Sequence, residues 1–349
     1  MDFGKYQRNL SRIQKRRRAF KGDAANFRTL VQVCLEHLRP VTEPLALISQ
    51  IQRSGGSLLS QLFDGHPQIH AHPHELKIGH PKKNNWPPID LSDRPERWFN
   101  ILFEESTIRL FEKGYKKERT SDITFPFVFL PFLQKQIFLT YLRGSESCGL
   151  RDVFNAYMTS YFGAWLNNQN YADPKRVVTG FTPRLSDDAC NMDQFFDIYP
   201  DGRLISIIRN PKNWFPSALR HNAKIKRDKY GDICSAIEQW RTNAQAMVRN
   251  KSCYAERVCI IRFEDLIRST EPVMRTLAAF LQIEFDEILL VPTFNRCPIQ
   301  ANTSFDDRES GILQSTLVRH QTLTGEEIDI IEEMTGEIYQ EALGHALAI

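Results

Sequence analysis

The sequence lacks several features that would assign a protein to a class at once. Its seven cysteines contain no C-x-x-C pair and are odd in number, which speaks against a disulfide framework and indicates a reducing compartment. No apolar run approaches the length of a membrane-spanning helix, and no signal-peptide pattern follows the N-terminus. We therefore expect a cytoplasmic protein, although removal of an anchor would leave the same pattern. The net charge of +3 is too small to indicate a nucleic-acid-binding protein.

A further absence concerns phosphate binding. The apolar run Leu45 to Ile51 is followed by QRSGGSLL (residues 52–59), which predicts a strand, a loop and the start of a helix. A loop that holds a nucleoside triphosphate has the form G-x-x-x-x-G-K-[ST], with a lysine and a magnesium-binding hydroxyl. Here the loop carries one cation, Arg53, so backbone N–H groups and a helix N-terminus would cradle an anion without an obvious seat for a metal. The pattern favours sulfuryl transfer over phosphoryl transfer.

Short apolar, β-branched runs alternate with helical patterns along the chain. Besides Leu45 to Ile51, such runs lie at Val177 to Phe181, Leu204 to Ile208 and Val258 to Ile261. Helical patterns lie near residues 24–38, 150–168, 232–250, 270–282 and 324–342. Continuous apolar runs suit strands that are buried on both faces. We predict an α/β fold with a P-loop-like open parallel sheet flanked by helices.

The expected domain organisation is simple. Residues 1–40 form a basic helical N-terminal segment, and residues 41–349 form a single domain. An insertion at about residues 76–145 is too long for a simple crossover, so we place it on the substrate side. Within it, Thr124 to Phe132 is aromatic and carries two prolines, which disfavour a central strand. We interpret that segment as core or as a lid packed on the sheet.

Basic residues crowd the N-terminus. Residues 5–21 contain eight lysines and arginines, and Asp2 is the only acidic residue among the first twenty-two. Our first interpretation is a solvated helix, and the second is contact with an anionic membrane surface or an anionic acceptor. Nucleic-acid targeting ranks third.

A second anion site is predicted after another strand. The run Leu204 to Ile208 leads into Arg209, and Ser217 follows just beyond Pro216. Because proline suits the first helical position, we expect Pro216 to begin a helix whose N–H groups and Ser217 hydroxyl meet a second phosphate beside Arg209. Two anion sites at the ends of two parallel strands fit a nucleotide with phosphates at both ends of its ribose.

Three blocks resemble sulfotransferases that use 3′-phosphoadenosine 5′-phosphosulfate (PAPS). QRSGGSLLSQLFDGHPQI (52–69) is similar to their 5′-phosphosulfate loop and helix, and PDGRLISIIRNPKNWFPSALR (200–220) is similar to their 3′-phosphate motif. VCIIRFEDLI (258–267) resembles a strand followed by an E-D-L segment. The R-S-G sequence is typical of the branch that holds tyrosylprotein and many carbohydrate sulfotransferases.

The resemblance implies an in-line transfer of the sulfuryl group from PAPS, a co-substrate, to an acceptor hydroxyl. A glycan or glycolipid is the favoured acceptor, while a tyrosine or a small alcohol stays open. Arg53 would neutralise charge on the leaving 5′-phosphate and on the equatorial sulfuryl oxygens. The implied cofactor-binding residues are Arg53, Ser54, Gly55, Gly56, Ser57, Leu58, Arg209 and Ser217.

The resemblance also implies a base. In the tyrosylprotein branch a glutamate beyond the loop accepts the proton of the acceptor, and Glu75, twenty-two residues past Arg53, is the matching residue. His72 or His74 is the reserve base. Alternation of His70, His72 and His74 would place three imidazoles on one face of a strand, as a zinc site could use, but we expect no metal.

Three further positions are compared with the family. Arg184 stands where many relatives carry a lysine, and Phe263 stands where some carry a tyrosine that reaches toward adenine. Residues 302–304 resemble a late loop that closes over the nucleotide.

Two other functions compete with this one. A non-catalytic protein on the same fold could hold a nucleotide or an anionic surface. A nucleotide kinase is less favoured: Glu264 and Asp265 imitate a magnesium-binding pair, but the loop lacks its lysine and its metal hydroxyl.

Overall fold

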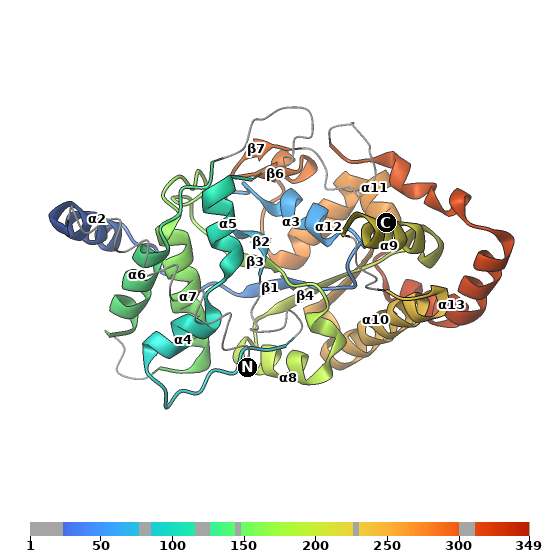
Figure 1. The fold of residues 1–349 in the computed structure, drawn as a ribbon, viewed down its shortest axis with the longest axis horizontal. Coiled ribbons are helices and arrows are strands. Elements are labelled where there is room, and N and C mark those ends of the chain that lie inside the picture. Colours follow the sequence, from blue (N-terminus) through green and yellow to red (C-terminus); the bar gives the residue numbers. More distant parts are fainter. Residues whose placement is uncertain are drawn as a thin grey trace. The chain divides into compact units, whose positions relative to one another are not determined.

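The computed structural model in Figure 1 describes residues 24–76, 85–115, 126–143, 148–225, 230–299 and 311–348. The chain divides into two compact units. The first comprises Met1–Glu43, Lys77–Lys116 and Thr120–Asp173, and the second comprises Pro44–Leu76, Lys117–Arg119 and Pro174–Ile349. Most of the expected insertion falls in the first unit, which continues to Asp173. The basic segment 5–21 and residues 302–304 lie outside the described residues.

A five-stranded parallel sheet forms the centre of the second unit. Its strands are β1 (Leu45–Ile48), β2 (Ile69–Glu75), β3 (Val177–Phe181), β4 (Arg203–Ile208) and β5 (Val258–Arg262). They lie in the order β2-β3-β1-β4-β5, and every pair is parallel. The strand order therefore reverses at β1, with β2 and β3 on one side and β4 and β5 on the other. Open α/β sheets bind ligands at such a reversal. The predicted fold class is confirmed.

Burial explains why the predicted strands form. Every residue of β1 and β3 is buried, as a strand covered on both faces requires. β1 ends at Ile48 rather than at Ile51. The next residue is Ser49, whose hydroxyl donates to the carbonyl oxygen of Thr182 (2.7 Å). One strand of the sheet, β2, was not among the predicted apolar runs because Pro73 and three histidines interrupt its apolar pattern.

Helices cover the sheet on both faces (Figure 1). α3 (Gly56–Phe63) and α12 (Thr270–Leu281) lie on one side, and α8 (Ala189–Ile198) and α10 (Ile233–Tyr254) lie on the other. Leu59, Leu62, Phe63 and Leu277 share one apolar core with the strands and have no exposed surface. α13 (Gly325–His345) packs against α10, and α11 (Phe263–Arg268) follows β5.

Short elements complete the second unit. They are the hairpin of β6 (Thr293–Phe294) and β7 (Cys297–Pro298) and the 3₁₀ turns η2 (Leu185–Asp187), η3 (Ala255–Arg257), η4 (Glu287–Leu290), η5 (Gln314–Leu317) and η6 (Arg319–Thr322).

One helix begins earlier than predicted. α9 spans Pro211–Ile225, so the expected start at Pro216 is wrong. The reason is that Asn210 caps the helix: its Oδ1 accepts the N–H of Lys212 (2.9 Å), and Pro211 takes the first helical position. Pro216 lies inside the helix, where it removes one intrahelical hydrogen bond. The N-terminal amides of α9 are therefore not at Ser217.

The first unit is helical. It contains α2 (Ala24–Glu36), α4 (Pro95–Leu102), α5 (Glu105–Lys113), α6 (Pro131–Arg143) and α7 (Leu150–Ala164). Phe127 and Phe129 are buried, with stacked rings whose centroids are 5.4 Å apart, and α6 begins at the second proline of their segment. The core interpretation of Thr124 to Phe132 is thus confirmed over its described part. No described helix of the chain is both long enough and apolar enough to cross a bilayer.

The five predicted helices also form. The patterns near residues 24–38, 150–168, 232–250, 270–282 and 324–342 become α2, α7, α10, α12 and α13, with shifted ends.

Candidate functional site

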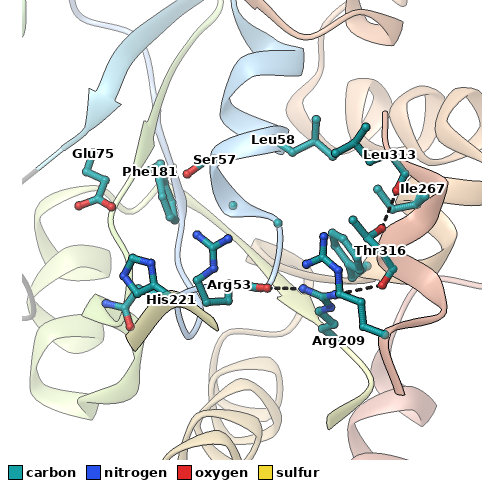
Figure 2. Close-up of a pocket in the computed structure, with 15 residues that line it drawn as sticks. Arg53, Ser57, Leu58, Glu75, Phe181, Arg209, His221, Ile267, Leu313 and Thr316 are labelled. Atoms are coloured by element: carbon teal, nitrogen blue, oxygen red, sulfur yellow. Dashed lines mark hydrogen bonds between the residues drawn. The ribbon is translucent and has the colours of Figure 1, made fainter. Parts of the chain in front are cut away.

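A cavity of about 210 Å³ lies at the carboxyl end of β1, within the second unit. Seven of the predicted site residues line it, as Figure 2 shows in part: Arg53, Gly55, Gly56, Ser57, Leu58, Glu75 and Arg209. Arg53 and Arg209 reach one cavity because they follow β1 and β4, which are neighbours in the sheet. Ser54 and Ser217 do not line it.

The loop after β1 has a strained backbone that other residues hold in place. Arg53 has a φ of 73°, in the left-handed region that costs an ordinary residue about 1 to 2 kcal/mol. The indole Nε1 of Trp214 donates to the carbonyl oxygen of Gln52 (2.8 Å), and Nη1 of Arg209 donates to that of Arg53 (2.6 Å). Two neighbouring carbonyls are thus fixed from β4 and α9, and the strained turn persists.

Both loop glycines are required by space. A Cβ atom on Gly55, whose φ is 95°, would lie 2.6 Å from the Phe263 ring. A Cβ atom on Gly56 would lie 2.0 Å from Nε2 of Gln50. Side chains at either position would collide with buried neighbours, so the bare backbone itself forms this wall of the cavity.

The start of α3 supplies amide groups at this wall. The N–H of Leu59 donates to the carbonyl oxygen of Gly55 (3.0 Å), so the amides of residues 56–58 precede the first turn of hydrogen bonds. Such a helix end carries partial positive charge and favours an anion. The arrangement is suited to holding a phosphate or sulfuryl group.

Arg209 is almost completely buried, with 3% of its surface exposed. Its Nη1 and Nη2 donate to the carbonyl oxygens of Arg53 and Thr316, drawn as dashed lines in Figure 2. Its guanidinium carbon lies 4.4 Å from the centre of the Phe263 ring, a cation–π contact. These contacts take the place of solvent around a buried charge.

Burial lowers the pKa of Arg209 to about 9, and the nearby cations Arg319 and Arg53 act in the same direction, against Glu264. Burial also lowers the pKa of Arg53. At neutral pH Arg209 stays charged. The Nε atoms of Arg53 and Arg209 are buried and have no hydrogen-bond partner among the described residues. The cavity is therefore cationic and has donors to spare.

Sequence reasoning missed a third arginine. Arg319 lines the cavity from η6, and its Nη1 donates to the Ser217 hydroxyl (2.8 Å). Ser217 is fully buried and donates in turn to the carbonyl oxygen of Asn213 (3.2 Å). A phosphate contact by Ser217 stays a prediction, because in this structure its hydroxyl holds Arg319. Arg319 carries no motif that could have singled it out.

Glu75 and His221 stand on the opposite side of Arg53 from Arg209 (Figure 2). Glu75 ends β2 and lies in register with Phe181 of β3. His221 belongs to α9 and was not predicted, since nothing in the sequence of that helix marks one face as a cavity wall. The reserve bases His72 and His74 do not line the cavity.

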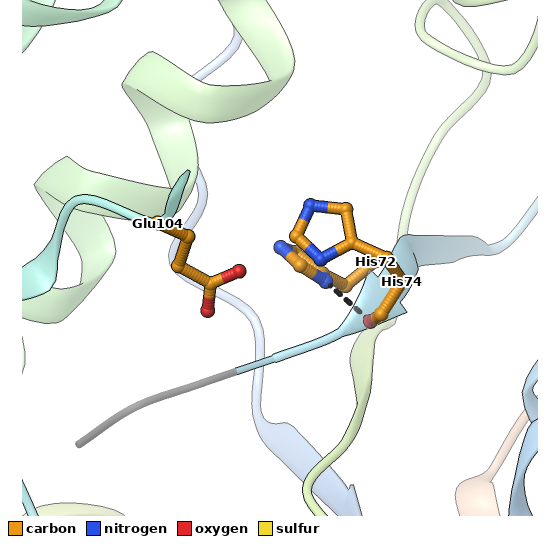
Figure 3. A group of neighbouring side chains, drawn as sticks. All are labelled: His72, His74 and Glu104. Carbon is orange, nitrogen blue, oxygen red and sulfur yellow. Dashed lines mark hydrogen bonds between the residues drawn. The ribbon is translucent and has the colours of Figure 1, made fainter. Parts of the chain in front are cut away.

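The histidines of β2 contact one another (Figure 3). Nδ1 of His72 lies 2.9 Å from the carbonyl oxygen of His74, and the two ring centroids are 4.3 Å apart. The register of β2 against β3 shifts between Ala71 and Glu75. Burial lowers the pKa of His70 to about 3.

Two further residues differ from their expected surroundings. Nε of Arg184 forms an ion pair with Oδ2 of Asp187 (3.0 Å), and Arg184 does not line the cavity. Phe263 lines it, with its ring already in contact with Arg209.

These features define a class of protein: an α/β protein whose glycine-containing loop after its central strand has the geometry of an anion site. Residues 44–287, more than half of the chain, match the model of the sulfotransferase family. The chain belongs to that family.

One solved structure with a TM-score above 0.5 shares this fold, and two others are reported beside it. The chain is similar to the sulfotransferase domain from the Synechococcus PCC 7002 olefin synthase, with 17% identity, a TM-score of 0.51 and coverage of 85% of this chain and 96% of that one. The sulfotransferase domain from the curacin biosynthetic pathway is 16% identical, with a TM-score of 0.48 and coverage of 84% of this chain and 98% of that one. A mouse sulfotransferase whose structure was determined in complex with 3′-phosphoadenosine 5′-phosphate (PAP) is 11% identical, with a TM-score of 0.39 and coverage of 91% of this chain and 94% of that one. No curated protein matches.

Gly55→Ala should destabilise the second unit by about 1 to 3 kcal/mol, because a Cβ atom at positive φ is strained and meets Phe263. Urea unfolding measures the change. Gly336→Ala is the matched control: this glycine lies in α13, where a Cβ atom would meet no neighbour beyond its own turn of the helix, so alanine should stabilise by about 0.5 to 1 kcal/mol. Equal stability of Gly55→Ala and the wild type would contradict the steric argument.

Stability should fall as the pH drops from about 6.5 toward 3, in part through His70. Its pKa is about 3 in the folded protein against 6.5 for an ordinary histidine, so the unfolded chain takes up the proton first. The wild type should therefore lose up to about 2 kcal/mol more than His70→Gln between pH 7 and pH 5. Urea unfolding at both pH values tests this, and parallel pH profiles would refute it.

Proposed function

We propose that this protein transfers the sulfuryl group of PAPS to an acceptor hydroxyl. The observation that carries the proposal is that Arg53, Arg209 and the N-terminal end of α3 line one shared cavity. Its position at the reversal of strand order is where α/β proteins of this kind hold nucleotides. Membership of the sulfotransferase family supports the same chemistry.

The residues present fit an anionic nucleotide. Three arginines line the cavity, and the buried Nε atoms of Arg53 and Arg209 have no partner among the described residues. A bound anion would accept hydrogen bonds from these donors and would reduce the repulsion between the like charges. The backbone of residues 55–58 leaves room for close approach because Gly55 and Gly56 carry no side chain.

Different residues of the chain bind the two ends of the nucleotide. When bound, PAPS supplies an activated sulfuryl group on its 5′-phosphate. Arg53 and the amides of residues 54–58 hold that end and stabilise the charge that grows there. Arg209 and Ser217 hold the 3′-phosphate, and Arg319 adds a third cation on that side of the cavity.

Glu75 accepts the proton that the acceptor hydroxyl loses. Its carboxylate lines the cavity on the side of Arg53 away from Arg209. An acceptor that enters there meets the base and the arginine together. Among acceptors we propose a sugar hydroxyl of a glycan or glycolipid, by family resemblance, and contact of residues 5–21 with an anionic membrane would favour the glycolipid.

The test incubates the wild-type protein and sulfur-labelled PAPS with a chelator and three acceptor groups: oligosaccharides and glycolipids, tyrosine peptides, and small alcohols. We expect label on the first group without added metal. Calorimetric binding of 3′-phosphoadenosine 5′-phosphate (PAP) with no labelled acceptor would instead indicate a non-catalytic binding protein. Magnesium-dependent transfer from a nucleoside triphosphate would indicate a kinase.

Glu75→Gln should lower turnover by roughly 10² to 10⁴ and leave the affinity for PAP unchanged, because the amide cannot accept the proton. Glu284→Gln, an exposed glutamate of the second unit, serves as the control and should keep wild-type turnover. Steady-state kinetics and calorimetry measure both. Normal turnover in Glu75→Gln, with loss in His221→Gln, would transfer the role to His221.

A further inference from the structure

A buried glutamine lies directly behind the anion cradle. Gln50 stands two residues past β1 and has no exposed surface. Neither its Nε2 nor its Oε1 has a hydrogen-bond partner among the described residues. Burying an amide unpaired is costly, and a leucine of similar size would avoid that cost. An unpaired buried amide at this place therefore suggests a partner that arrives with a ligand.

Gly56 makes room for this amide. A Cβ atom on Gly56 would lie 2.0 Å from Nε2 of Gln50 and 2.4 Å from the Phe181 ring. The carboxamide thus occupies the space of a side chain at the first residue of α3. Gly56 and Phe181 both line the cavity, so this space adjoins it. The backbone of Gln50 is held by Arg184, whose N–H donates to its carbonyl oxygen (3.1 Å).

Other unpaired polar atoms surround the same helix end. Ser54 is 1% exposed, and neither its hydroxyl nor Nε of Arg53 has a hydrogen-bond partner within the described part of the chain. α3 has eight residues, and its first amides line the cavity. The start of α3 and Arg53 line the cavity, while the Gln50 carboxamide lies behind its wall at Gly56 and Ser54 precedes Gly55 in the same loop. A helix dipole, a guanidinium, a hydroxyl and a carboxamide are the groups of which oxyanion sites are composed.

We propose that Gln50 is an additional ligand of the anion held at the start of α3, with its Nε2–H donating to a phosphate or sulfuryl oxygen. The inference rests on the proposed function and deepens it, because it assigns Gln50 to the 5′ end of the nucleotide. Gly56 is then the residue that gives the carboxamide access, and Arg209 and Arg319 serve the other phosphate.

Gln50→Leu tests this, since leucine is close in size and removes both polar atoms. Calorimetry would use two probes, PAP and adenosine 3′-phosphate, which lacks the 5′-phosphate. PAP should bind about ten- to a hundredfold more weakly than to the wild type, and adenosine 3′-phosphate equally well. The ligand-free variant should melt at the same or a higher temperature, because an unpaired amide has been removed. A purely structural glutamine would instead lower the melting temperature.

Gln134→Leu is the matched control, a fully buried glutamine of the first unit that should leave both affinities unchanged. Unchanged PAP affinity in Gln50→Leu, or equal weakening of both probes, would overturn the inference. Gln50→Met provides the same comparison if the leucine variant does not fold. A wild-type protein that binds no PAP would refute the proposed function itself, which separates the two failures.

Discussion

The hydrogen bond from Arg209 to the carbonyl oxygen of Arg53 is the contact on which the site depends (2.6 Å). It joins the segment after β4 to the loop after β1, and with Trp214 it holds the turn in which Arg53 has positive φ. That turn directs the Arg53 side chain into the cavity and brings Gly55 against Phe263. A guanidinium with several donors suits this task, because it can hold two carbonyls and keep N–H groups for a ligand.

Charge explains the rest of the site. Arg53, Arg209 and Arg319 share one cavity, and burial together with mutual repulsion lowers the pKa of Arg209. Buried like charges are unfavourable without a partner of opposite charge, so binding of an anion would stabilise this site. Carbonyl oxygens, the Phe263 ring and Glu264 compensate part of the buried charge of Arg209. The proposed role of Gln50 extends the same principle to a neutral group.

Much of the fold could be predicted because its signals are local. Apolar runs marked β1, β3, β4 and β5, since burial on both faces leaves no polar position in such strands. β2 escaped because its polar residues are accommodated by tertiary surroundings that periodicity cannot represent. The early start of α9 was missed because Asn210 competed with Pro216 as the helix signal, and its side-chain cap prevailed.

By itself the sequence determined the glycine loop, its single cation and the strand that delivers them, because these depend on spacing along a few residues. It also predicted a second anion site with Arg209 at the end of another parallel strand, and the pairing of β1 with β4 then placed Arg209 beside Arg53. Only the tertiary structure decided that Arg319 and His221 line the same cavity and that the Gln50 carboxamide lies beside Gly56. Arg319 and His221 come from η6 and α9, far from the loop in sequence, and they reach it only through packing, which no local pattern encodes. Gln50 is close in sequence, but only the packing of Gly56 and Phe181 shows where its carboxamide lies.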